Sequence, residues 1–136
     1  MKKRIIVGAT GASGQPLLIK CLEIIRESEE FESYLIMTES ARLTLESETT
    51  WKVEEVEALA DHVLQPVEIG AGPASGSFRT AGMVIVPCSM KTIAGIHSGY
   101  AENLLLRAAD VTIKEQRPLV LAAREAPLSP IHLRNL

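Results

Sequence analysis

Arg4-Ile5-Ile6-Val7 runs directly into Gly8-Ala9-Thr10-Gly11-Ala12-Ser13-Gly14, and this stretch decides the fold. The β-branched run predicts a buried strand, the glycines predict a tight loop, and apolar residues then recur at helical spacing. Pro16 suits the first turn of that helix, where a missing N–H is harmless, and Ser13 or Gly14 is a suitable cap. The opening of the chain therefore predicts a strand, a glycine loop and a helix.

The same alternation continues along the chain. Further strands are predicted over residues 33–37, 83–86 and 118–123, and helices over 38–45, 53–63 and 104–111. Residues 70–80 lack periodicity and are rich in small residues, which predicts a functional loop. Strands that alternate with helices predict an α/β fold, a doubly wound parallel sheet in a Rossmann-like three-layer sandwich.

Length and composition limit the classes of function. With 136 residues, 46% of them hydrophobic, the chain has the material for one domain spanning residues 1–136. Its 14 basic and 17 acidic residues give a net charge of −3, which argues against a nucleic-acid partner. No stretch approaches the roughly 20 apolar residues of a membrane span. We expect a cytoplasmic protein.

The cysteines and histidines form no pattern typical of metal ligands. Cys21 and Cys88 belong to no CxxC pair, and His62, His97 and His132 have no metal-ligand spacing between them. No metal is therefore expected. Cys88 follows a predicted strand and is interpreted as a small buried residue rather than as a nucleophile.

Two predicted loops should meet at one edge of the sheet, because ligands of open parallel sheets bind beyond the carboxyl ends of the strands. Gly11, Ala12 and Ser13 precede a helix, whose N-terminus favours an anion such as phosphate. A plain tight turn is the alternative, since the glycines do not have GxGxxG spacing. Residues 88–92 add hydroxyls, amides and one cation at a second helix start.

Charged residues elsewhere are open to two interpretations. Arg124 and Glu125 follow the last predicted strand, either as an ion pair or as two convergent polar groups. Arg107 and Lys114 lie seven residues apart on one helix face, where they could receive a phosphate or simply be solvated. Nothing within the sequence separates Glu48 from the neighbouring acidic residues.

Several ordered motifs, spread over nearly the whole chain, resemble the UbiX-type flavin prenyltransferases, formerly described as aromatic acid decarboxylases. They are Thr10-Gly11-Ala12-Ser13-Gly14, Ser75-Gly76-Ser77-Phe78, Val86-Pro87-Cys88-Ser89-Met90-Lys91-Thr92, Arg107-Ala108-Ala109-Asp110 with Lys114-Glu115, and Arg117-Pro118-Leu119-Val120-Leu121 leading to Arg124-Glu125-Ala126-Pro127-Leu128.

The resemblance implies a reaction. Such enzymes join a dimethylallyl group from dimethylallyl phosphate to reduced FMN and so make the prenylated FMN cofactor of UbiD-type decarboxylases. It also implies a homo-oligomer, a dodecamer in the family. The FMN-binding residues implied are Gly11, Ala12, Ser13, Thr38, Ser89, Met90, Lys91, Thr92 and Arg124.

Catalytic roles come from the same resemblance. Ser13 and Glu125 would form a proton-transfer pair near the reacting flavin atoms. Glu48, Arg107 and Lys114 would line the prenyl-phosphate pocket, in the family partly from neighbouring subunits. Cations must hold this phosphate, because ionising an allyl phosphate leaves a dianionic leaving group.

The sequence departs from the family in two places. Gln15 and Pro16 stand where smaller or more apolar residues are expected. The chain stops at Leu136, whereas the family continues through another strand and a final helix that supply a tyrosine and an arginine to the substrate phosphate. An FMN-binding or assembly subunit of an aromatic acid decarboxylase, without transferase activity, is therefore one alternative.

A second alternative is an FMN-dependent cysteine decarboxylase. Those enzymes carry a Pro-Ala-Ser-Ala-Asn-Thr type segment and an early catalytic histidine. Pro73-Ala74-Ser75-Gly76-Ser77-Phe78 departs from that segment, and no histidine precedes His62.

Overall fold

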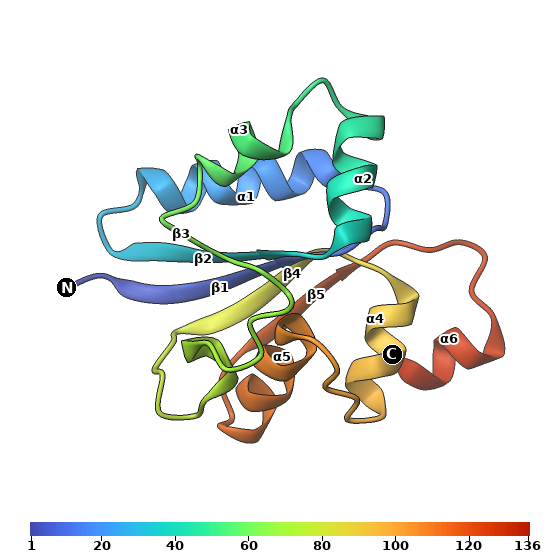
Figure 1. The fold of residues 1–136 in the computed structure, drawn as a ribbon. Helices are drawn as coiled ribbons and strands as arrows, with labels where there is room; N and C mark the ends of the chain where they lie inside the picture. The colour runs from blue at the N-terminus through green and yellow to red at the C-terminus, as the bar shows by residue number, and fades with distance from the viewer.

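Five parallel strands form the centre of the computed structural model, which describes all residues from 1 to 136. Their order across the sheet is β3-β2-β1-β4-β5 (Figure 1). They are β1 (Lys3–Ala9), β2 (Phe31–Met37), β3 (His62–Leu64), β4 (Gly82–Cys88) and β5 (Leu119–Ala123). The predicted α/β fold with a doubly wound parallel sheet is confirmed.

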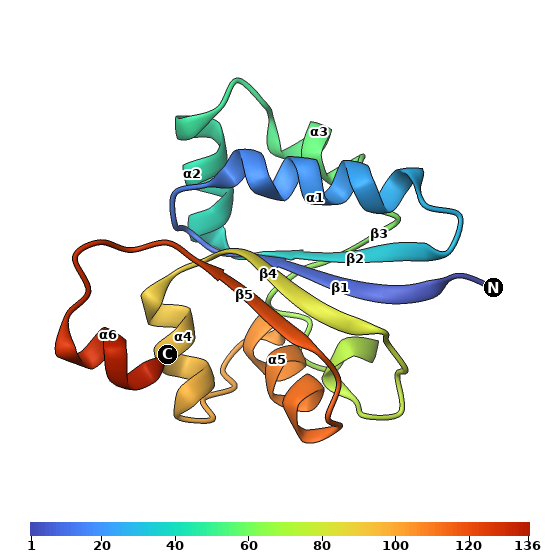
Figure 2. The same ribbon diagram turned by 180° about the vertical axis from the view of Figure 1, so that it is seen from behind.

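Helices cover both faces of this sheet. One face carries α1 (Gln15–Glu27), α2 (Glu39–Glu48) and α3 (Val53–Glu57). The other carries α4 (Met90–His97), α5 (Leu104–Lys114) and the short 3-10 helix η1 (Gly72–Ala74). The last helix, α6 (Pro130–Asn135), lies beside α4, and Figure 2 shows the three layers from behind.

Each face of the sheet has its own apolar core. On the first face, Leu18 and Leu22 of α1 and Leu45 of α2 pack against β1, β2 and β4 with no exposed surface. On the second, Leu105 of α5 packs against Ile85 of β4. The apolar character of the strands on both faces explains why the sequence shows continuous apolar runs rather than alternation.

Strand order reverses between β1 and β4, because the chain moves outward from β1 to β2 and β3 and then returns to add β4 and β5 on the other side. The loops after β1 and β4 therefore diverge to opposite faces. In open sheets of this kind a ligand crevice lies at that reversal, beyond the carboxyl ends of the strands. This edge is on the right in Figure 1.

The helix predicted over residues 53–63 is wrong in its second half. The structure ends α3 at Glu57 and places β3 at His62–Leu64, in parallel pairing with β2. Asp61 fixes this change, because its carboxylate accepts a hydrogen bond from the Ser33 N–H at 2.8 Å and its own N–H donates to the Ser33 hydroxyl. This contact between distant segments stabilises a strand where local spacing favours a helix.

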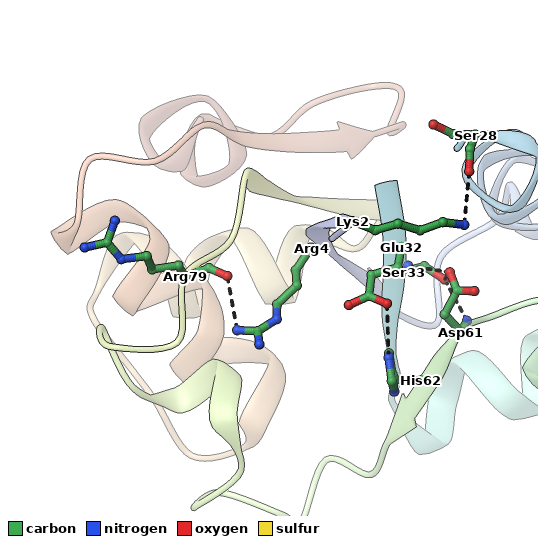
Figure 3. A network of polar contacts seen from close by, with 8 residues as sticks. All are labelled: Lys2, Arg4, Ser28, Glu32, Ser33, Asp61, His62 and Arg79. Carbon is green, nitrogen blue, oxygen red and sulfur yellow. Dashed lines mark hydrogen bonds and ion pairs between the residues drawn. The ribbon is translucent and has the colours of Figure 1, made fainter. Parts of the chain in front are cut away.

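The amino ends of the strands carry a separate polar network (Figure 3). His62 forms an ion pair with Glu32 at 3.4 Å when protonated and stacks on Tyr34. Arg4 lies over the Phe78 ring, 4.1 Å from its centroid, and donates to the Arg79 carbonyl. These residues lie at the edge of the sheet opposite to the glycine loop.

Candidate functional site

The glycine loop after β1 has three free backbone donors. The N–H groups of Gly11, Ala12 and Ser13 form no hydrogen bond within the chain. Gly14 is the N-cap of α1 with φ 112°, a left-handed conformation that favours glycine, and Pro16 lies in the first turn as predicted. Free donors at a helix start suit a polar or anionic group.

Thr10 joins this loop to the loop after β4. Its hydroxyl donates to the Pro87 carbonyl at 3.0 Å and accepts from the Ser89 N–H at 2.8 Å, while the Thr10 N–H also donates to Pro87. Thr10 is 2% exposed, so these bonds are shielded from water. The two loops at the strand reversal are therefore held as one unit.

The start of α4 forms the second wall of the site. Ser89 is its N-cap and accepts from the Thr92 N–H at 3.1 Å, and the two hydroxyls lie 2.9 Å apart. The N–H groups of Met90 and Lys91 have no partner within the chain. Lys91 is exposed and adds a positive charge beside these donors.

Two further predicted residues lie at the same edge. Thr38 follows β2 and caps α2 by accepting from the Ala41 N–H, and its own N–H donates to Ala9 at the end of β1. Arg124 follows β5, and the pairing of Cys88 with Ala123 places it beside Ser89. The residues predicted to bind the cofactor therefore follow the carboxyl ends of β1, β2, β4 and β5, at one edge of the sheet.

Glu48 closes the N-terminus of α1. Its carboxylate accepts from the N–H groups of Gln15 at 2.7 Å and Gly14 at 3.0 Å. These bonds, that from Gln15 first, lower the pKa of Glu48, and the Ser13 hydroxyl and the Arg124 charge act in the same direction. The sequence predicts that the N-terminus of this helix binds an external anion such as phosphate. In the structure the Glu48 carboxylate occupies the N-terminus of α1 instead.

A pH dependence follows from this contact. Glu48 has a lower pKa in the folded chain than its ordinary value of 4.5, so its ionised form stabilises the fold. That contribution is complete above about pH 5.5 and is lost as pH falls through the folded pKa. We expect the melting temperature of wild type to fall more steeply than that of Glu48→Gln between about pH 5 and about pH 3. Parallel curves in a thermal melt series would contradict this.

Two predicted residues lie away from this cluster. Arg107 and Lys114 are both exposed on α5, about 10 Å apart along the helix axis. Helix α5 covers the face of the sheet opposite to α1 and α2, so neither cation shares a pocket with Glu48 of the same chain. Glu125 is exposed and forms neither an ion pair with Arg124 nor a hydrogen bond.

Cys88 is buried at the end of β4. Burial raises the pKa of its thiol to about 12, so it stays protonated at neutral pH, in agreement with the prediction that it is not a nucleophile. No group of three or more histidine, cysteine or acidic side chains is placed to hold a metal ion.

Sequence reasoning missed the residues that shape the glycine loop. Thr10 was part of a motif without a role, Gln15 was noted only as a departure from the family, and Thr44 was not singled out. Gln15 is fully buried and donates to the carbonyls of Thr10 and Ala12, and Thr44 donates to the carbonyl of Gly11. A glutamine at the first position of an amphipathic helix, on the same face as the apolar residues Leu18 and Leu22, was the available signal.

The donor set fits FMN. Five unpaired N–H groups, those of Gly11, Ala12, Ser13, Met90 and Lys91, lie at one edge with the hydroxyls of Thr38 and Ser89 and the cations Lys91 and Arg124. A cofactor with a phosphate, a hydroxylated chain and ring carbonyls has acceptors for all of these donors. The fold and this site define a flavoprotein, and the profile of the Flavoprotein family matches residues 1–135.

Comparison with curated proteins identifies the group of flavoproteins to which the chain belongs. The chain is 56% identical over 133 residues to a probable UbiX-like flavin prenyltransferase of Streptomyces sp. (strain D7), covering 98% of this chain and 66% of the relative. It is 50% identical to the flavin prenyltransferase UbiX of Escherichia coli (strain K12), covering 97% of this chain and 70% of that protein. The chain belongs to the UbiX-like flavin prenyltransferases, and it spans about two thirds of the length of these curated relatives.

A solved structure agrees with this assignment. The crystal structure of AnUbiX in complex with FMN and dimethylallyl pyrophosphate has a TM-score of 0.97 and 50% identity, over 99% of this chain and 71% of that one. The family, the flavin cofactor class and the prenyltransferase class expected from the sequence are confirmed. Solved structures of cysteine decarboxylases match at 20% identity or less, which shows a shared fold alone. None of the helices has the length and apolar character that a membrane crossing needs.

Proposed function

We propose that this chain binds FMN at the edge formed by the loops after β1 and β4 and takes part in transfer of a dimethylallyl group from dimethylallyl phosphate to reduced FMN. The observation that carries the proposal is the set of unpaired N–H groups on two loops that Thr10 joins. Its membership of the UbiX-like family supports the reaction class. When bound, reduced FMN would supply the nucleophilic ring that the prenyl group alkylates.

Different residues of the chain would bind different parts of FMN. Arg124, Lys91 and the first turn of α4 would hold the FMN phosphate, because charge and helix dipole both favour an anion there. Gly11, Ala12 and Ser13 would offer their N–H groups to the rest of the cofactor. Glu48 would keep the FMN phosphate away from the start of α1, since its carboxylate already accepts from the N–H groups of Gly14 and Gln15.

The prenyl-phosphate pocket would need a second copy of the chain. Glu48 lies on one face of the sheet, and Arg107 and Lys114 lie on the other, so one chain cannot place them around one phosphate. The UbiX-like decarboxylase structure from Escherichia coli O157:H7, with a TM-score of 0.95 and 52% identity over 97% of this chain, is dodecameric. A similar homo-oligomer would bring Arg107 and Lys114 of one copy to Glu48 of another.

The product would have a use outside this protein. Prenylated FMN is the cofactor expected for a UbiD-type decarboxylase, which would receive it in the cytoplasm. An FMN-carrying subunit without transferase activity is the alternative.

Mass spectrometry separates these two functions. The purified chain is incubated anaerobically with reduced FMN and dimethylallyl phosphate, and the released flavin is weighed. We expect a prenyl-sized mass increase. If FMN returns unchanged while a full-length relative is active in parallel, and FMN still copurifies with the chain, the chain binds flavin without transferring the prenyl group.

A further inference from the structure

Gln15 is the most deeply buried polar side chain next to the flavin edge. It has no exposed surface, and its Nε2 donates to the Thr10 carbonyl at 2.9 Å and to the Ala12 carbonyl at 3.0 Å. We propose that Gln15 is a positioning residue, which orients the glycine loop so that its N–H groups face the flavin. This inference rests on the proposed function, because it concerns how the same loop binds FMN.

Because the peptide unit is planar, the two hydrogen bonds from Gln15 also fix the direction of backbone N–H groups in the loop. In a planar trans peptide the C=O and N–H groups point in opposite directions. The Thr10 carbonyl shares a peptide unit with the Gly11 N–H, and the Ala12 carbonyl shares one with the Ser13 N–H. When one amide group holds both carbonyls, it turns both N–H groups away from itself and from the core.

Thr44 completes the arrangement from another helix. Its hydroxyl donates to the Gly11 carbonyl at 3.0 Å, and that peptide unit also contains the Ala12 N–H. Three consecutive carbonyls of the loop are therefore held by side chains of α1 and α2, and the three N–H groups of the same units have no partner within the chain. Consecutive N–H groups left free in this way can bind an anionic or carbonyl group.

The unpaired Oε1 atom of Gln15 supports a role for the hydrogen bonds that its Nε2 group donates. Oε1 is buried without a hydrogen-bond partner, an arrangement that destabilises a folded protein. Exchanging the two amide atoms would place an oxygen against two carbonyls, so the hydrogen bonds fix the orientation. An apolar side chain of similar size would fill the space without this cost, and it would leave the loop carbonyls unheld.

FMN affinity of matched variants tests the proposal. Gln15→Met keeps the volume and removes both donors, and Thr44→Val keeps the β-branched shape and removes the third. We expect fluorescence titration to show a dissociation constant for FMN raised roughly tenfold by each single change, and more by both. Gln65→Met is the control. It also removes a side-chain amide, one that accepts a hydrogen bond from Arg42, but Gln65 follows β3, two strands away from β1 and its glycine loop. This variant should leave the affinity unchanged.

Gln15→Glu gives a readout that packing alone would not produce. An ionised carboxylate repels the two carbonyls, whereas the protonated form can donate to one of them. The ratio of its FMN dissociation constant to that of wild type should therefore fall as pH is lowered from about 8 to about 5.5. A ratio independent of pH, or unchanged affinity in folded Gln15→Met, would overturn the role of Gln15. Failure of wild type to bind FMN would instead overturn the proposed function.

Discussion

Glu48→Gln is expected to lower the rate of prenyl transfer by roughly a hundredfold to ten-thousandfold, the range typical of a lost acid–base group. The carboxylate is held at the glycine loop by the N–H groups of Gly14 and Gln15 and lies beside the Ser13 hydroxyl. These contacts keep it ionised and hold it against the glycine loop. Glutamine retains the size of the side chain and one acceptor oxygen, but it can neither carry the charge nor accept a proton.

The measurement is single-turnover formation of prenylated flavin at saturating FMN and dimethylallyl phosphate. Glu46→Gln is the matched control, since Glu46 lies on the same helix and its carboxylate instead accepts from the Val53 N–H. We expect that variant to act like wild type. Equal rates for Glu48→Gln and Glu46→Gln would show that Glu48 has no catalytic role.

The rate of prenyl transfer in Glu125→Gln tests whether Glu125 or Glu48 is the proton-transfer partner of Ser13. The resemblance pairs Ser13 with Glu125, whereas within one chain the structure places Ser13 beside Glu48 and leaves Glu125 exposed without a hydrogen bond. If Glu125 carries the proton, its variant should show the larger loss of rate. We expect the larger loss in Glu48→Gln.

Local patterns sufficed to predict much of this protein. The strand, glycine loop and helix at residues 4–27 depend on neighbours in sequence, and the loops after β1 and β4 meet because parallel strands share one carboxyl edge. Thr38 and Ser89 cap helices that begin one residue later, so their role was also local. Elements of this kind carry their own signals.

Contacts between distant segments could not be predicted in this way. Glu48 is 33 residues from Gln15 in sequence, and no spacing rule connects the end of one helix to the start of another. The same holds for Asp61, whose bonds to Ser33 end α3 early. Arg107 and Lys114 satisfy a helical spacing, but the layer of the sandwich that α5 occupies decides which residues they can approach.

Gly11→Ala is expected to disrupt the loop that all these contacts shape. A Cβ built on Gly11 would lie 2.6 Å from the Ser40 Cβ and 3.3 Å from the Ser40 carbonyl carbon, in the first turn of α2. Because the obstacle includes helix backbone, either α2 or the loop must move. Overpacking of this kind destabilises a fold by about 1–3 kcal/mol, and movement of the loop should reduce FMN affinity beyond the effect of Gln15→Met.

A second substitution can distinguish this clash from a general loss of stability. Ser40→Gly removes the Cβ that lies nearest, at a cost of about 0.5–1 kcal/mol for glycine in a helix. In the double variant Gly11→Ala with Ser40→Gly, most of the FMN affinity lost in Gly11→Ala should return. The fold should regain less stability than affinity, because the new glycine destabilises α2. Strictly additive losses in a double-mutant cycle, measured by urea unfolding and FMN titration, would show that the close approach to α2 is not what requires glycine at position 11.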